Sequence, residues 1–365
     1  MRVQVRAMIV AAGIAVCLAA PARAWDAGSD PLKAEIDQFL GGLEAKTHGV
    51  VSWEGSDPYE VKQDGAGAVA VINHARLSIH ILGKELAQLA FDHLEIRRGP
   101  DPNDDKLVDF SFVLPAKSTL TTADGTQVKL SLKDAKASIV AEAQSGHLRQ
   151  SASSLASARI EEAKSGSWIN FGPLTASLKI AVDAKGGFTG VADMEWKKIE
   201  FRVPNGPAGG TMERIRYTGT VTGPSLADIY KIQAQMQAMS QHATHEQQFV
   251  GLLELLPALM AAYSEGSGEF EADGIAIRGP NGPVFTLAKG TIGSQGGFGG
   301  DNAALRITLK YDGLDLAPSV LPADKVPHRV DIDLGVENVS TAALRAMIAA
   351  TGKMNGSDAD KQTAT

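Results

Sequence analysis

The chain has 365 residues, of which 44% are hydrophobic and 21% charged, and its 35 Lys+Arg face 42 Asp+Glu. An acidic chain is repelled by nucleic acid and by anionic lipid headgroups, so the composition excludes both as expected partners. Aromatic residues make up only 5%, which disfavours the stacked aromatic platforms of many sugar-binding proteins.

The first residues have the features of a secretion signal. Arg2 and Arg6 precede an apolar run over 7–20, and small residues occupy the minus-three and minus-one positions before Trp25. This pattern predicts a signal peptide over 1–24, cleaved between Ala24 and Trp25, and export to the periplasm.

Two other interpretations of this segment are weaker. The apolar run is shorter than the about 20 residues of a membrane span, so no integral membrane span is expected in the mature chain. Cys17 could carry a lipid, but the bulky Val16 precedes it where a small residue is preferred. Cys17 is the only cysteine, so cleavage would leave a chain without disulfides or thiolates and with a net charge of −10.

An N-terminal helix is expected within 25–50. Its apolar residues recur at steps of three and four, which places them on one stripe, and they are Leu32, Ile36, Phe39, Leu40 and Leu43. Asp30 and Pro31 are suitable residues for the start of this helix.

Antiparallel strands are expected over 51–224 and again over 265–338, as parts of the same sheet system. Alternation of apolar and polar residues indicates strands with one buried and one solvated face. The clearest rows are 108–114, 128–133, 174–182, 305–312 and 329–336.

A helical insertion is expected over 225–264. Its second part is apolar on nearly all sides, so protein or ligand must surround it. We assign it as the candidate ligand-binding segment, with the side chains Phe249, Leu252, Leu253, Leu256 and Met260. A C-terminal helix over 339–354, capped by Ser340, and a disordered tail over 355–365 complete the expected elements.

Short motifs repeat where strands are expected to leave the sheet. Four segments pair two apolar residues with a Gly or Pro exit, and they start at Asp92, Lys198, Asp273 and Asp312. Their unequal spacing indicates a long meander in which similar strands end at similar edges. The glycine-rich segment 293–300 is expected to be a flexible hairpin loop.

No catalytic residue, metal ligand or cofactor is assigned. His242 and His245 lie three apart beside Glu246, but no third ligand stands at motif spacing, so a solvated helix face is expected. The acidic loop 101–105 lacks the spacing of a calcium hand. Signatures of serine hydrolases and zinc proteases are absent.

The signal peptide, the strands with proline exits and the Leu255-Leu256-Pro257 helix resemble proteobacterial envelope proteins of repeated amphipathic strands, which are likened to AsmA-type or tubular lipid-binding folds. The resemblance spans about 51–338 and implies lipid handling, without carrying over any catalytic residue.

The expected fold is therefore mainly β with a helical insertion (α+β). A long, twisted antiparallel sheet, curved or rolled, would pack on the 225–263 helices. The expected function is non-enzymatic binding of a lipid-like, apolar ligand in the cell envelope. The alternative is an envelope scaffold with a self-packed core, no ligand and a protein partner.

Overall fold

The computed structural model describes residues 31–46, 50–81, 84–144, 147–203, 208–232, 261–298 and 301–343, together with 235, 255, 258 and 346. In this part of the chain, nineteen strands form one antiparallel sheet, accompanied by the short helices α2 (Pro31–Gly41) and α3 (Leu43–Lys46). The predicted mainly β class with a large antiparallel sheet is confirmed.

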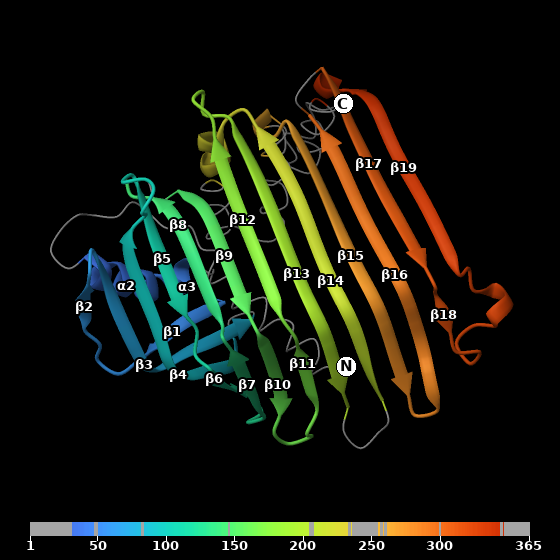
Figure 1. Ribbon diagram of the computed structural model, residues 1–365, viewed down its shortest axis with the longest axis horizontal. Helices are drawn as coiled ribbons and strands as arrows, with labels where there is room; N and C mark the ends of the chain where they lie inside the picture. Colours follow the sequence, from blue (N-terminus) through green and yellow to red (C-terminus); the bar gives the residue numbers. More distant parts are fainter. Residues whose placement is uncertain are drawn as a thin grey trace, which may run out of the picture.

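The strands follow the chain as a meander (Figure 1). Their bounds are β1 (Val51–Gly55), β2 (Val61–Asp64), β3 (Gly67–Ile81), β4 (Lys84–Pro100), β5 (Leu107–Val113), β6 (Lys117–Thr122), β7 (Gln127–Lys133), β8 (Lys136–Glu142), β9 (Leu148–Leu155), β10 (Ser157–Glu162), β11 (Trp168–Phe171), β12 (Leu174–Val182), β13 (Phe188–Arg202), β14 (Gly209–Gly223), β15 (Glu265–Gly279), β16 (Gly282–Gly297), β17 (Asn302–Asp312), β18 (Asp315–Leu316) and β19 (Arg329–Ser340). A 3-10 turn, η1 (Ala323–Lys325), precedes β19.

Several positions in the sheet are filled by two short strands in tandem. Following β4 across the sheet, the first such position contains β5 and β6 end to end. The next three positions contain β8 with β7, β9 with β10, and β12 with β11. Pro115 lies between β5 and β6, and Pro173 lies between β11 and β12. Proline has no N–H to donate to a neighbouring strand, so each of these breaks interrupts the ladder of hydrogen bonds.

The breaks belong to a line that crosses the sheet, which we call the crease. Along it the backbone enters the left-handed region, at positive φ, at His74, Asp134, Lys198, Gly274 and Gly313. Strand pairing aligns them: Lys198 lies opposite Glu213, and Gly274 lies opposite Ala288. The Ala288 N–H in turn donates to the carbonyl of Gly313 at 3.3 Å.

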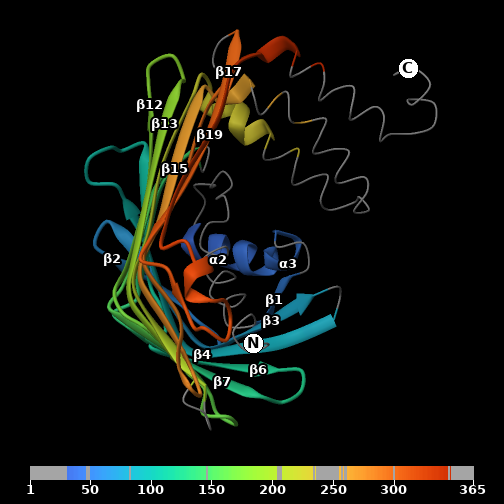
Figure 2. The same cartoon turned by 90° about the vertical axis from the view of Figure 1, so that its right-hand side faces the viewer.

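In a regular strand, one residue separates two side chains that point to the same face. At the crease, two residues separate them. Trp196 and Ile199 flank one such pair on β13, and Ala272 and Ile275 flank another on β15. Aligned irregularities of this kind bend a sheet without breaking it. The bend is visible edge-on in Figure 2, where α2 and α3 lie on the concave side.

The main core fills the N-terminal part of this concavity. Leu32, Ile36 and Leu40 of α2 pack on buried residues of the sheet such as Ile72 and Phe110. The steps of four between the helix residues place them on one face, which explains why this face is buried while the outer face of α2 is solvated. A turn at Gly42 divides the N-terminal helical segment into α2 and α3.

The helical insertion is described only at its two ends. Residues 226–232 are helical, and the Tyr230 ring stacks on His147 at 4.0 Å, while its hydroxyl donates to the Leu148 carbonyl at 3.1 Å. At the other end, Tyr263 meets Phe188 edge to face at 6.3 Å. Both ends therefore lie at the edge of the sheet where β12 and β14 finish, on its concave side (Figure 2).

Two expectations about loops and exits were wrong. Gly293–Gly297 are not a loop but part of β16, because each pairs with a residue of β15 and each can lie in an extended strand. The repeated motifs also do not all exit at one edge. β13, β15 and the β17–β18 strand run in the same direction, whereas β4, an odd number of antiparallel steps from β13, runs oppositely.

Candidate functional site

Strand register defines the two faces of the sheet, because residues directly opposite each other on neighbouring strands share a face. One row begins at Phe110, in the core beneath α2, and reaches Leu334 on the last strand. Its members are Phe110, Ile139, Ser151, Leu178, Ala192, Gly219, Gly268, Ser294, Ile307 and Leu334. The concave face that holds α2 thus continues to β19.

A second row shows that the concave face is also apolar across the crease. It begins at Phe91 in the same core and ends at Leu316. Its members are Phe91, Ser118, Leu130, Ile160, Ile169, Phe201, Gly210, Ile277, Phe285 and Leu316. The one extra residue that each of these strands has at the crease therefore keeps apolar side chains on one face in both halves of the sheet.

The candidate site is the concave surface of β14–β19 between the crease and the helical insertion, which we call the apolar face. Its exposed members are Tyr217, Phe270, Ile292, Leu305, Ile307, Leu309, Ile332, Leu334 and Val336, which are between 38% and 65% exposed. Five of them, from Tyr217 to Ile332, are direct cross-strand neighbours in one row. Contiguous exposed apolar surface of this kind marks a binding surface.

Glycines replace larger side chains at the centre of the apolar face. Gly219 pairs with Gly268, and Gly266 pairs with Gly296, so two neighbouring rows carry little side-chain volume where they cross β15 and β16. The ring of Tyr217 lies along this gap, since a Cβ at Gly219 would stand only 2.6 Å from its hydroxyl. Gly219 and Gly268 thus give the Tyr217 ring room to lie against the backbone.

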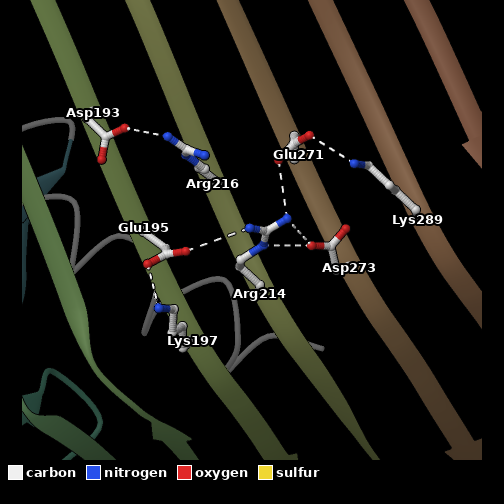
Figure 3. Close-up of polar contacts among 8 residues, drawn as sticks. All are labelled: Asp193, Glu195, Lys197, Arg214, Arg216, Glu271, Asp273 and Lys289. Carbon is white, nitrogen blue, oxygen red and sulfur yellow. Dashed lines mark hydrogen bonds and ion pairs between the residues drawn. The ribbon is translucent and has the colours of Figure 1, made fainter.

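The convex side of the same strands carries the opposite chemistry (Figure 3). The Arg214 Nε donates to Asp273 at 2.6 Å, and its Nη2 donates to Glu271 at 3.3 Å. These carboxylates raise the pKa of Arg214. Lys289 extends the network with a contact of 3.0 Å to Glu271. The convex face is therefore charged here, and these acidic and basic side chains neutralise one another.

A hollow of about 470 Å³ also lies on the convex side of β13–β17. Its lining includes Thr220, Ser267, Thr308 and Arg306. Hydroxyl and charged groups on an open surface favour water over an apolar ligand, so we do not assign this hollow as the apolar site.

The N-terminal part of the concave face is closed by α2, and a carboxyl group is buried there. Glu35 is 8% exposed, and its Oε2 lies 3.3 Å from Nε of Arg98 on β4. Burial raises the pKa of Glu35 to about 7, while Arg98 opposes this rise. Neither carboxylate oxygen accepts a hydrogen bond in the described structure. The apolar face farther along the sheet has no such helix among the described residues.

The sequence-predicted site residues Phe249, Leu252, Leu253, Leu256 and Met260 lie outside the described residues, as do Ala24 and Trp25 at the predicted cleavage point. The structure therefore leaves both assignments as predictions. Sequence reasoning had identified the apolar rows of β17 and β19 as the buried sides of strands. It missed that the side chains on these rows are exposed, since alternation marks a face but not what covers it.

His242, His245 and Glu246 also lie outside the described residues. Within the described ranges, no three His, Cys, Asp or Glu side chains gather closely enough to hold a metal ion. Of the helices that are described, none is both long enough and apolar enough to span a membrane.

Comparisons with protein-family models, with curated proteins and with solved structures found no match for this chain.

Proposed function

We propose that this protein is a non-enzymatic, periplasmic protein that binds a lipid-like, apolar ligand on its apolar face. The observation that carries the proposal is the row of exposed apolar side chains from Tyr217 to Ile332, which lies on the same face as the buried core beneath α2. Exposed apolar side chains are costly in water, at roughly 25 cal/mol per Å², and an apolar ligand would remove that cost.

The shape of the face supports an elongated ligand. The rows cross the strands, which are about 4.8 Å apart, so five neighbouring strands present a strip about 20 Å long. Beside this strip, a Cβ at Gly266 or Gly296 would meet no atom closer than 3.5 Å, so a chain could approach the backbone there. A flexible hydrocarbon chain matches these dimensions and needs no hydrogen-bond partners.

Export to the periplasm is part of the same proposal and is supported by the features of residues 1–24. An intact-mass measurement should show a chain that starts at Trp25. Retention of residues 1–24 would contradict export by cleavage after Ala24.

Lipid binding can be tested with a matched pair of variants on β16. Ile292 is 52% exposed on the apolar face, whereas Gln295 is exposed on the convex face of the same strand. Ile292→Asp should weaken binding of a fluorescent fatty acid on the order of tenfold, because a charge would be desolvated by the ligand. Gln295→Asp should bind as the parent does.

Native mass spectrometry of protein purified from its own periplasm supplies the second measurement. A co-purifying lipid mass is expected. Equal binding by the parent and Ile292→Asp, together with a bare parent mass, would refute the proposal.

A scaffold function is the second candidate, and the packing of α2 favours it. In the N-terminal part of the sheet, Leu32, Ile36 and Leu40 pack on the concave face and cover it from within the chain. A scaffold would give a bare mass together with a stable envelope protein partner.

A further inference from the structure

The last strand of the sheet, β19, is an open edge. In the described part of the chain, it pairs with β17 alone, and Figure 1 shows it as the outermost strand on the C-terminal side. Every second backbone N–H and C=O group of an edge strand points away from the sheet and can bind another strand. β19 has twelve residues, so about half of them point these groups outward.

The opposite edge of the sheet is protected, and β19 is not. At the N-terminal edge, β1 and β2 have only five and four residues, and short edge strands limit pairing with other chains. From Val330 to Val336, β19 contains no proline, no lysine and no bulge. The irregularity at Asn338, where φ is +59°, comes only near its end.

The side chains of β19 are also prepared for a neighbour on its free side. Leu334 and Val336 are 65% and 58% exposed, the highest values on the apolar face. On the convex side, Asp333 is bound by Arg306 at 2.8 Å, and Asp331 is bound by Lys310 at 3.3 Å. These acids are therefore neutralised within one chain and would not repel a second acidic strand strongly.

Two charges near the ends of β19 remain without an ion pair among the described residues. They are Arg329 at the start and Glu337 near the end, both exposed and on the convex side with Asp333 midway between them. In an antiparallel pair of two β19 strands centred on Asp333, Arg329 of each copy faces Glu337 of the other. The same register places Val330 opposite Val336 and Ile332 opposite Leu334, apolar against apolar.

We propose that β19 binds β19 of a second copy of this chain, antiparallel and centred on Asp333. The contact is symmetric, as two-fold dimers require. It would join the apolar faces of two copies into one continuous concave surface. This inference rests on the edge strand and its charges, and it stands independently of the proposed ligand.

Crosslinking tests the register. In the full chain, Asp333→Cys should form a covalent dimer under mild oxidation, because the two cysteines would be direct cross-strand neighbours. Asp331→Cys is the matched control, since the two copies of residue 331 would lie about 13 Å apart. Equal crosslinking of both variants, or crosslinking of the control alone, would overturn the proposed register.

Charge exchange tests the contact without a cysteine. Arg329→Glu should weaken dimer formation, measured by analytical ultracentrifugation, on the order of tenfold, since two attractive pairs become repulsive. Adding Glu337→Arg should restore the parent affinity. A double variant as weak as the single one, or a parent that stays monomeric at every concentration, would overturn the proposal.

Discussion

The buried carboxyl of Glu35 should make the stability of this protein depend on pH, and Glu35→Gln should remove that dependence. The side chain is buried on the sheet-facing side of α2, with Arg98 Nε 3.3 Å away as its charged neighbour. Its pKa is about 7 in the folded protein and near its ordinary value of 4.5 in the unfolded chain. The folded state therefore binds a proton more tightly than the unfolded state does.

The sign and size of the effect follow from this difference. Well below pH 4.5 the carboxyl is protonated in both the folded and the unfolded state, so ionisation of Glu35 does not affect the free energy of unfolding. Between pH 4.5 and 7 the unfolded chain ionises first, so the free energy of unfolding falls as pH rises. Since each pKa unit corresponds to about 1.4 kcal/mol, the full loss above pH 7 is about 3 kcal/mol.

Urea unfolding followed by circular dichroism from pH 4.5 to 8 measures this loss. The Gln amide cannot ionise, so the difference in free energy of unfolding between Glu35→Gln and the parent should shift by about 3 kcal/mol in favour of the variant over that range. The ion pair with Arg98 exists only while Glu35 is ionised, so its contribution is already contained in the raised pKa of Glu35. A difference that stays constant with pH would refute the reasoning.

Three further predictions concern the sheet itself. Gly210→Val should lower the free energy of unfolding by about 1–3 kcal/mol, because a Cβ there would stand 2.5 Å from the Phe201 ring and overpacking is costly. Gly99→Ala is the control, since the nearest atom to a Cβ there is at 3.9 Å. Equal urea midpoints of the two variants would contradict the packing argument. Gly274→Val should lower the free energy of unfolding, measured by thermal unfolding, by about 1–3 kcal/mol, since φ of Gly274 at the crease is +61°. An unchanged thermal midpoint would show that the crease tolerates residues with a side chain. Arg214→Ala should lower the thermal midpoint only slightly, and this effect should disappear in high salt, because its ion pairs are partly exposed. A large loss that persists in salt would contradict this.

The strands were predictable because their signal is local. Alternation over 174–182 requires only that successive side chains point to opposite faces, and β12 shows this alternation in its burial along its whole length. The same local logic predicted a helix over the stripe that contains Leu32, Ile36 and Leu40, whose side chains are buried in α2.

The crease was visible in the sequence only as isolated Asp-Gly steps. Asp273-Gly274 and Asp312-Gly313 belong to the repeated motifs, and glycine there reaches positive φ without strain. That these steps line up with Lys198 on another strand depends on register, which arises from pairing between distant segments. A search for two polar residues between apolar ones, in place of one, could have found the line.

Glycines show the same division between local and long-range information. The run 293–297 has the composition of a loop, yet it forms the end of β16 because β15 and β17 supply partners on both sides. Backbone hydrogen bonds from neighbouring strands outweigh the weak local preference of glycine.

The amino-acid sequence by itself determined where the alternating strands lie and which side of each is apolar, since both follow from the two-residue period of an extended chain. Only the tertiary structure decided which part of the apolar side is covered. α2 buries the N-terminal part, whereas Ile292, Ile307 and Leu334 remain exposed. The reason is physical: burial depends on what packs against a surface, and that partner comes from elsewhere in the chain or from another molecule.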